Sequence, residues 1–194
     1  MAITETDICN QALMKVGAKP LIAALWAEDS DNARICRTFY ASVRDAVLRS
    51  HPWNCAIHRT TITALAAAPD SDWDHQYQLP TNPWCLRILQ VGALEDQPTR
   101  WTVEGRRLLT NENSPPIVYI KRITDTNEFD ALLVDALVLK LAIKLVMPLT
   151  KDLQMLKGLT DELETISLPE ARSVDGQEQS VQRIQTSEFI DSRY

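Results

Sequence analysis

Residues 131–147 are apolar almost throughout, and this stretch constrains the fold more than any other feature of the chain. Within it only Asp135, Lys140 and Lys144 are polar. A stretch of this length with three charges is too short and too polar to span a membrane, which needs about 20 predominantly apolar residues. A helix that is apolar around nearly its whole circumference is buried on several sides. We therefore expect a helix over about residues 127–147, covered either by its own domain alone or partly by a neighbouring subunit.

Helical periodicity also occurs before and after this stretch. Thr4 followed by Asp7 resembles a capping box, and Gly17 is typical of a helix end. Apolar residues then recur at steps of three and four until His51 and Pro52 interrupt the pattern. Including the central segment, the sequence predicts four helices, over about residues 4–17, 30–50, 127–147 and 150–167.

Between residues 55 and 123 the apolar period shortens from 3.6 towards 2, and β-branched and aromatic residues accumulate. The best strand pattern is that of residues 73–79, where Trp73, His75, Tyr77 and Leu79 alternate onto one face. Further strands are predicted over residues 85–91, 101–103, 106–109 and 117–123. The predicted fold class is therefore α+β: a bundle of about four helices with a β-rich insertion, an antiparallel sheet or sandwich, between the second and third helices.

Pro148 is expected to end the central helix, and Thr150 to cap the helix that follows. From residue 172 onwards the chain is polar and of mixed charge, with only widely spaced apolar residues. Such segments are usually frayed tails, although some become ordered on a partner. We predict a single domain over residues 1–171 and an extended C-terminal arm over residues 172–194.

Charge and glycine content exclude two large classes of function. The formal net charge is -6 and the pI is near 5.1, so the molecule should repel phosphate backbones, and a sequence-specific DNA binder is disfavoured. The chain has 5 glycines, and the two nearest, Gly92 and Gly105, are too far apart to serve one phosphate-binding loop. We therefore expect neither a dinucleotide-binding nor a P-loop enzyme, and no cofactor.

Candidate catalytic and metal-binding residues are few. The four cysteines are scattered and predict reduced, mostly buried thiols, and the first ten residues lack a secretory signal, which favours a reducing cytoplasm. Cys55 and His58 have the spacing of half a metal site. A small hydrolase using Cys85 or Ser71 with His75 remains an alternative, because nucleophilic hydrolysis needs such a pair. No G-x-S-x-G or H-E-x-x-H motif is present. We predict no catalytic, cofactor or metal site.

The stretch from Tyr40 to Ala56 includes the run Arg49-Ser50-His51-Pro52-Trp53-Asn54-Cys55-Ala56, which has no evident catalytic purpose. With Arg44-Asp45, it resembles the tubular tail protein A family, the head-to-tail adaptors of tailed bacteriophages. Cys55 stands where that family more often has phenylalanine. Three other blocks continue the resemblance in the same order: Ile8-Cys9-Asn10-Gln11-Ala12-Leu13 with Val16-Gly17, Tyr77-Gln78-Leu79-Pro80 with Cys85-Leu86-Arg87, and Tyr119 to Asp125 with Phe129-Asp130.

This resemblance, which covers about residues 8–147, implies a structural virion protein without enzymatic activity. Such adaptors form a ring, usually a dodecamer, that docks on the portal protein after DNA packaging and offers a platform for the downstream tail or nozzle protein. The resemblance implies a location at the head-tail junction of the virion, and in the host cytoplasm during assembly. A tail-completion or stopper protein of the same virion is the nearest alternative. An acidic ring would let double-stranded DNA pass during ejection without sequence-specific binding.

The resemblance also implies which residues matter, as structural positions and not as catalytic ones. Trp53 is expected to be buried, at a hinge between the second helix and the β-rich section. The expected structural motif comprises His51, Pro52, Trp53, Asn54, Tyr77, Leu79, Pro80, Arg122, Asp125 and Phe129. In such adaptors the C-terminal segment reaches towards the portal. The candidate arm residues are Arg183, Ile184, Phe189, Ile190 and Tyr194.

Overall fold

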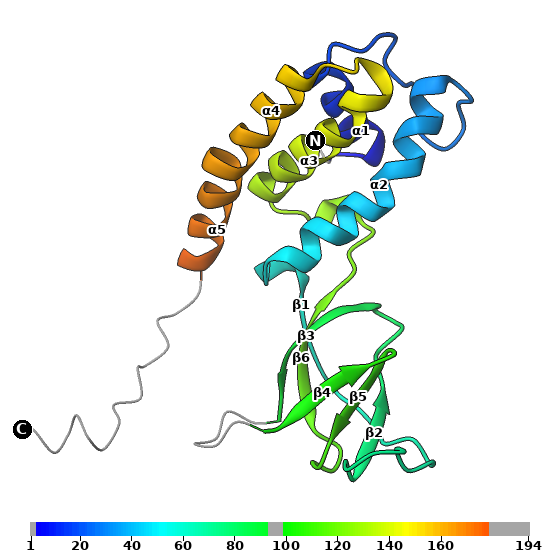
Figure 1. The fold of residues 1–194 in the computed structure, drawn as a ribbon, viewed down its shortest axis with the longest axis vertical. Helices are drawn as coiled ribbons and strands as arrows, with labels where there is room; N and C mark the ends of the chain where they lie inside the picture. The colour runs from blue at the N-terminus through cyan, green and yellow to red at the C-terminus, as the bar shows by residue number, and fades with distance from the viewer. Residues whose placement is uncertain (1–2, 93–98, 179–194) are drawn as a thin grey trace, which may run out of the picture.

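The computed structural model describes residues 3–92 and 99–178. Figure 1 shows two parts in contact: a helical part, and below it a smaller β part that is entered from the end of α2 and left just before α3. The predicted fold class is confirmed, because two small antiparallel three-stranded sheets lie between α2 and α3. The helices are α1 (Glu5–Lys15), α2 (Asp31–Ser50), α3 (Ala131–Leu149), α4 (Leu153–Glu162) and α5 (Leu168–Gln177), with short helical turns η1 (Asn54–Ala56), η2 (Thr126–Glu128) and η3 (Leu163–Ser167).

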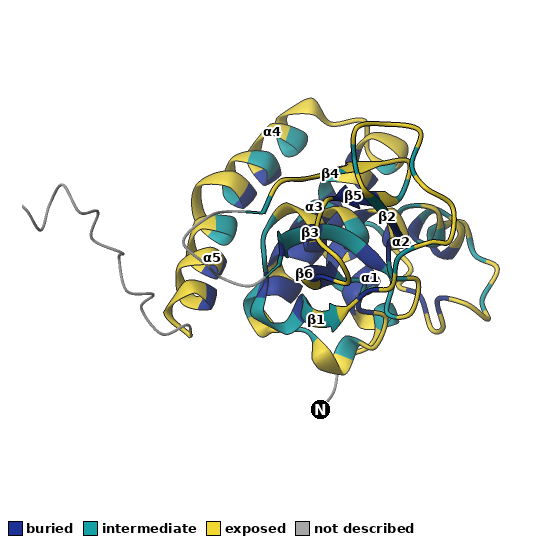
Figure 2. Cartoon of the chain, turned by 90° about the horizontal axis from the view of Figure 1, so that it is seen from below, coloured by how far each residue is buried: buried dark blue, intermediate teal, exposed yellow. Residues whose placement is uncertain are grey.

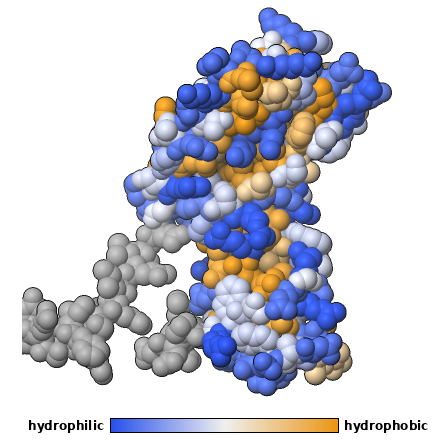
Figure 3. All heavy atoms as spheres, in the orientation of Figure 1, coloured by the Kyte–Doolittle hydropathy of each residue, from blue (hydrophilic) through white to orange (hydrophobic). Residues whose placement is uncertain are grey.

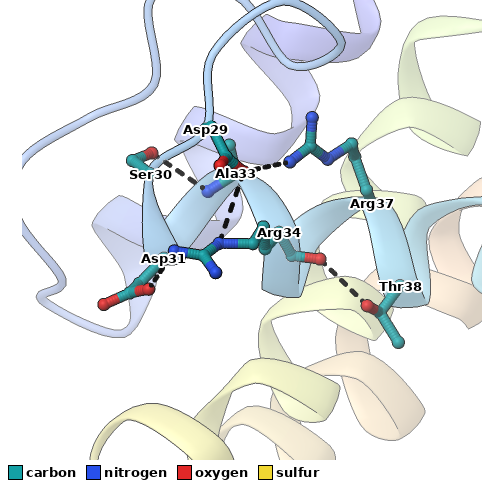
Figure 4. Close-up of polar contacts among 7 residues, drawn as sticks. All are labelled: Asp29, Ser30, Asp31, Ala33, Arg34, Arg37 and Thr38. Carbon is teal, nitrogen blue, oxygen red and sulfur yellow. Dashed lines mark hydrogen bonds and ion pairs between the residues drawn. The ribbon is translucent and has the colours of Figure 1, made fainter.

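The ends of the first two helices follow from local side-chain chemistry. Thr4 and Asp7 form the predicted capping box on α1. Beyond its last turn, Gly17 adopts a φ of 70°, a conformation that favours glycine. The helix is closed by hydrogen bonds from the Gly17 N–H to the Met14 carbonyl and from the Ala18 N–H to the Leu13 carbonyl. At the start of α2 the Ser30 hydroxyl accepts from the backbone N–H of Ala33, and Asp29 pairs with Arg34 and Arg37 (Figure 4). These ion pairs are mostly exposed, so they orient the chain more than they stabilise it.

The central helix α3 is covered by the protein's own chain. It packs against α1, α2, α4 and η3, and ten of its residues are buried, from Leu133 to Val146. Figure 2 shows the buried sides of the helices facing inward, while the outer sides of α4 and α5 are exposed. Of the apolar residues after Leu133 in this helix, Met147 and Pro148 are the exposed ones. The intramolecular alternative therefore accounts for the apolar stretch, and α3 gives no argument for a neighbouring subunit.

Two predictions at the end of α3 are wrong. Pro148 lies inside the last turn of the helix, which continues to Leu149. Proline lacks only its own N–H, and the N–H of Thr150, two positions later, still bonds to the Val146 carbonyl at 2.8 Å. The cap of α4 is Asp152 and not Thr150. The Asp152 carboxylate accepts from the backbone N–H groups of Gln154 and Met155.

The β part consists of two sheets of three strands each. The first has the order β1 (Ile57–Thr61), β6 (Pro116–Lys121), β3 (Cys85–Val91), and the second has the order β2 (His75–Gln78), β5 (Arg107–Thr110), β4 (Trp101–Glu104). All pairings are antiparallel. A second core of nine buried residues, among them Tyr77, Leu108 and Tyr119, lies between the sheets. β1 was not among the predicted strands, because its polar sequence His58-Arg59-Thr60-Thr61 carries no apolar alternation.

The strand predicted over residues 73–79 is shorter in the structure, because β2 pairs with β5 over only four residues. β5 begins at Arg107 and not at residue 106. Gly105 and Arg106, at φ values of 50° and 64°, form the two-residue turn between β4 and β5, where both central residues take positive φ. Arg106, which was predicted to begin the strand, therefore belongs to the turn.

The predicted C-terminal arm is wrong over its first residues. The helical segment expected to end near residue 167 continues through η3 and α5 to Gln177, so the first six residues of the predicted arm are helical. The physical reason is burial: Ala171 and Asp175, one helical turn apart, both face the rest of the protein. The remainder of the arm, residues 179–194, with Arg183, Ile184, Phe189, Ile190 and Tyr194, lies outside the described residues. Among the helices of the described part, none is long and apolar enough to cross a membrane.

Candidate functional site at the junction of helices and sheets

Trp53 lies at the point where the chain leaves the helical part, and its side chain is fully buried, as predicted. The indole Nε1 donates to the Val47 carbonyl at 3.0 Å, in the last turn of α2. The His51 ring meets the indole edge to face, with centroids 4.7 Å apart. Because Pro52 cannot continue the helix, α2 ends at Ser50 and the indole folds back under it. The expected hinge position is thus a packed and rigid corner.

Asp175 of α5 holds this corner from the opposite end of the chain. Its carboxylate lies 3.0 Å from His51 Nε2 and accepts the Asn54 backbone N–H at 2.9 Å. The Asn54 side chain in turn donates to the Asp175 carbonyl at 2.6 Å. The Asp175 side chain is 9% exposed, and the contacts join residues more than 120 positions apart. Two contacts of this buried carboxylate and one of the Asp175 backbone carbonyl fix the end of α5 against the junction.

Asp175 was missed by the sequence reasoning, which placed residue 172 onwards in an extended arm. The local sequence offers only a weak signal: Ala171 and Asp175 lie one helical turn apart and so share a face if the segment is helical. A lone aspartate in a polar segment nevertheless carries no information about a partner that lies 121 residues earlier.

A second set of polar contacts joins α2 to the sheets. The Asp45 carboxylate forms ion pairs with the guanidinium groups of Arg44 at 3.0 Å and of Arg122 at 2.5 Å. Because Arg122 follows β6 directly, this carboxylate joins α2 to the first sheet. The Arg122 guanidinium also lies over the Trp84 ring, 5.1 Å from its centroid, and the Arg106 guanidinium lies over the same ring at 3.8 Å. Cation–π contacts of this kind are worth about 0.5–2 kcal/mol. Trp84 is therefore the aromatic centre of the junction.

Arg106 brings the β4–β5 turn to the same place. Its guanidinium donates to the carbonyls of Cys85 and Pro80, and the Leu79 N–H donates to the Arg106 carbonyl. Arg49 at the end of α2 donates to the Leu86 carbonyl, and Arg87 of β3 returns a hydrogen bond to the Arg49 carbonyl. These contacts join the end of α2 to β3 of the first sheet, and the β4–β5 turn of the second sheet to the start of β3.

The remaining motif residues have structural surroundings. Tyr77 is buried between the sheets, where its hydroxyl donates to the Glu112 carbonyl and accepts the Ser114 N–H. Asp125 caps the short turn η2, and Phe129 packs half-buried against the main core. Most of the expected motif residues therefore converge on the junction, from His51 to Asn54 and through Leu79, Pro80 and Arg122, while Tyr77, Asp125 and Phe129 do not reach it.

A scan against protein-family models finds no match for the chain, and a search of curated proteins finds none either.

The candidate hydrolytic residues are not brought together. No hydrogen bond between described residues joins His75 to Cys85 or to Ser71; His75 instead lies edge to face with Tyr77, 6.3 Å away. All four cysteines are free thiols. Within residues 3–92 and 99–178, no group of three or more His, Cys, Asp or Glu side chains is placed to hold a metal ion, so the spacing of Cys55 and His58 gains no further ligand.

We expect the Cys85 thiol to be inert towards alkylation in the folded protein. Burial raises the pKa of Cys85 to about 11, so the reactive thiolate is scarce at mildly alkaline pH. Iodoacetamide at pH 8 should label Cys85 at least about a hundredfold more slowly in the folded chain than in the chain denatured with guanidinium chloride. Mass spectrometry of proteolytic peptides gives the rate. Fast labelling of the folded chain near neutral pH would instead mark an activated nucleophile and favour the hydrolase alternative.

Proposed function

We propose that this protein is a head-to-tail adaptor of a tailed bacteriophage. Twelve copies of the adaptor would dock as a ring on the portal and connect it to the tail. The observation that carries the proposal is the junction. Sequence blocks that resemble the adaptor family are separated by up to about 80 residues, and they supply the contacts that join α2 to the β part. The Asp45 carboxylate pairs with Arg122, the Arg49 side chain donates to the Leu86 carbonyl, and the Arg87 side chain donates to the Arg49 carbonyl. A shared motif with a structural purpose is what a non-catalytic adaptor needs.

The order of elements supports the same proposal. A helical bundle interrupted by a β-rich insertion after its second helix is the architecture that the family resemblance implies, and the chain has this order. The charge supports it as well, because a ring of chains that each carry -6 offers passing DNA a repulsive lining. In this role the protein has no catalytic site, and its partners are copies of itself, the portal protein, the downstream tail or nozzle protein, and the double-stranded DNA that passes through.

The test is co-sedimentation of the purified chain with the portal ring of the same phage. We expect the full chain to sediment with the portal, and a chain truncated after Glu178 to remain in the supernatant if the arm makes the contact. Truncation at this point keeps Asp175 and its contacts with His51 and Asn54. A chain truncated after Ala171 would remove them and confound loss of the arm with loss of the α5 anchor.

The alternatives predict different results in the same experiment. A stopper or tail-completion protein would sediment only when the adaptor ring already covers the portal. If neither the full chain nor the truncated chain sediments with the portal in either condition, the proposed function is wrong. Monomeric behaviour of the isolated protein does not bear on the result, because the ring is expected to assemble on the portal.

A further inference from the structure

A groove with a cavity of about 300 Å³ lies below the end of α2, between β3 and β4. Its lining includes Arg49 and Arg87 and Arg106, together with the apolar surfaces of Leu86, Trp101 and Val103. Trp101 is 36% exposed and Val103 is 41% exposed. Figure 3 shows hydrophobic surface where the helical part meets the β part, with hydrophilic side chains directly above it. The groove therefore combines apolar walls with positive charge.

The positive charge of the groove is not neutralised by the part of the chain that the structure describes. Within residues 3–92 and 99–178, no carboxylate lies within 4.0 Å of the guanidinium groups of Arg49, Arg87 or Arg106. Their described hydrogen bonds go to backbone carbonyls. In a chain with a net charge of -6, three arginines around one groove that have no carboxylate partner among the described residues are a local exception that suits an acidic ligand.

Among the strands that the structure describes, the two beside the groove each lie at the edge of a sheet. β4 ends the order β2-β5-β4, and β3 ends the order β1-β6-β3. An edge strand presents unpaired backbone N–H and C=O groups, to which an extended peptide can add as a further strand. The ligand that fits is thus an extended peptide with carboxylates for the arginines and large apolar side chains for the walls.

We propose that this groove binds residues 187–191 of the same chain, Ser-Glu-Phe-Ile-Asp, as an extended peptide. Glu188 and Asp191 supply two carboxylates, and Phe189 and Ile190 supply two adjacent apolar side chains. Apolar walls favour this occupant over a nucleic-acid phosphate, which would need charge and hydrogen bonds alone. Under the proposed function, the portal would compete with the groove for the same residues, but the inference about the isolated protein does not depend on that function.

The anchor of α5 places the peptide within reach of the groove. Asp175 bonds to His51 and Asn54, which follow Arg49 of the groove by only a few residues. The segment that follows the last described residue, Glu178, therefore begins near the groove. Eight residues lie between Glu178 and Ser187. At about 3.3 Å per extended residue they span about 26 Å. Tethering at this range gives an effective concentration on the order of millimolar, so binding within one chain outcompetes binding between dilute copies.

The test is hydrogen–deuterium exchange on the full chain, read from peptides that cover β3 and β4. In the variant with Phe189→Ala and Ile190→Ala, we expect the amides of β4 to exchange at least about tenfold faster than in the wild type. Val103→Asp places a repelling carboxylate in the groove without changing a buried residue, and it should deprotect β3 at the groove in the same way. The control is Val174→Ala, which removes an equally exposed apolar side chain from α5 and should change nothing at these strands.

Equal exchange in the wild type and in the double variant would overturn the proposal. Protection of β4 that disappears on tenfold dilution would also overturn it, because a groove filled by a second copy depends on concentration. Binding within one chain would be established if the wild-type groove strands are protected at every concentration, and if this protection is lost from β4 in the double variant and from β3 in Val103→Asp. None of these outcomes involves the portal, so failure here is distinguishable from failure of the proposed function.

Discussion

Trp53→Ala is expected to lower the free energy of unfolding by about 3–5 kcal/mol, the usual cost of a fully buried tryptophan. The side chain is 0% exposed, and it fills the corner between the end of α2 and the first turn of the β part. Its loss leaves a cavity that Pro52 and the clamped backbone at Asn54 cannot collapse into. It also removes the indole donor from the Val47 carbonyl, although the Ser50 hydroxyl continues to donate to that oxygen at 2.8 Å. The measurement is unfolding by urea, followed by circular dichroism.

Trp26→Ala is the matched control for this prediction. Trp26 is 62% exposed, and its Nε1 donates to the Glu5 carboxylate on the surface at 2.6 Å. The same chemical change at this position should cost less than about 1 kcal/mol, because little apolar area leaves water and the lost hydrogen bond is exposed. If Trp53→Ala kept the wild-type melting temperature, or if both variants lost stability equally, the junction would not be the rigid corner described above.

Features with a local cause were predictable from the sequence. The capping box of Thr4 and Asp7 and the glycine that closes α1 each act within four residues, and both are present. The apolar period of α2 correctly indicated its buried face, and the almost continuous apolar sequence of α3 correctly indicated burial on several sides. Burial of Trp53 was expected from the family resemblance, and the side chain is fully buried.

Features that depend on distant partners were not predictable. β1 is a strand because it pairs with β6, about 60 residues later, and its own sequence is too polar to indicate this. Arg106 reaches its partners only once the sheets have formed: its guanidinium donates to the Cys85 carbonyl at the start of β3 and lies over the Trp84 ring. The junction as a site was therefore inaccessible to periodicity, although the family resemblance named most of its residues without indicating that they touch.

The α5 anchor is the second feature with a large expected effect. Asp175→Ala removes a buried carboxylate that accepts from the Asn54 N–H and contacts His51, and hydrogen bonds to charged groups contribute about 1.5–3 kcal/mol each. We expect the variant to lose about 2–4 kcal/mol, mostly as local opening of α5, since the hydrogen bond from the Asn54 side chain goes to the backbone and survives. The amides of α5 should exchange more than about tenfold faster, as measured by hydrogen exchange.

Two further variants separate the anchor from a general effect of charge. Glu170→Ala removes an exposed carboxylate from the same helix and should leave exchange in α5 within about twofold of the wild type. Asp175→Asn keeps an oxygen for the Asn54 N–H but loses the negative charge facing His51, and it should retain about half of the anchor. If Asp175→Ala behaved like Glu170→Ala, α5 would be held by Ala171 and its apolar neighbours alone. The segment after α5 would then have no fixed origin beside the junction, and both the proposed route of the arm and its reach to the groove would lose their structural basis.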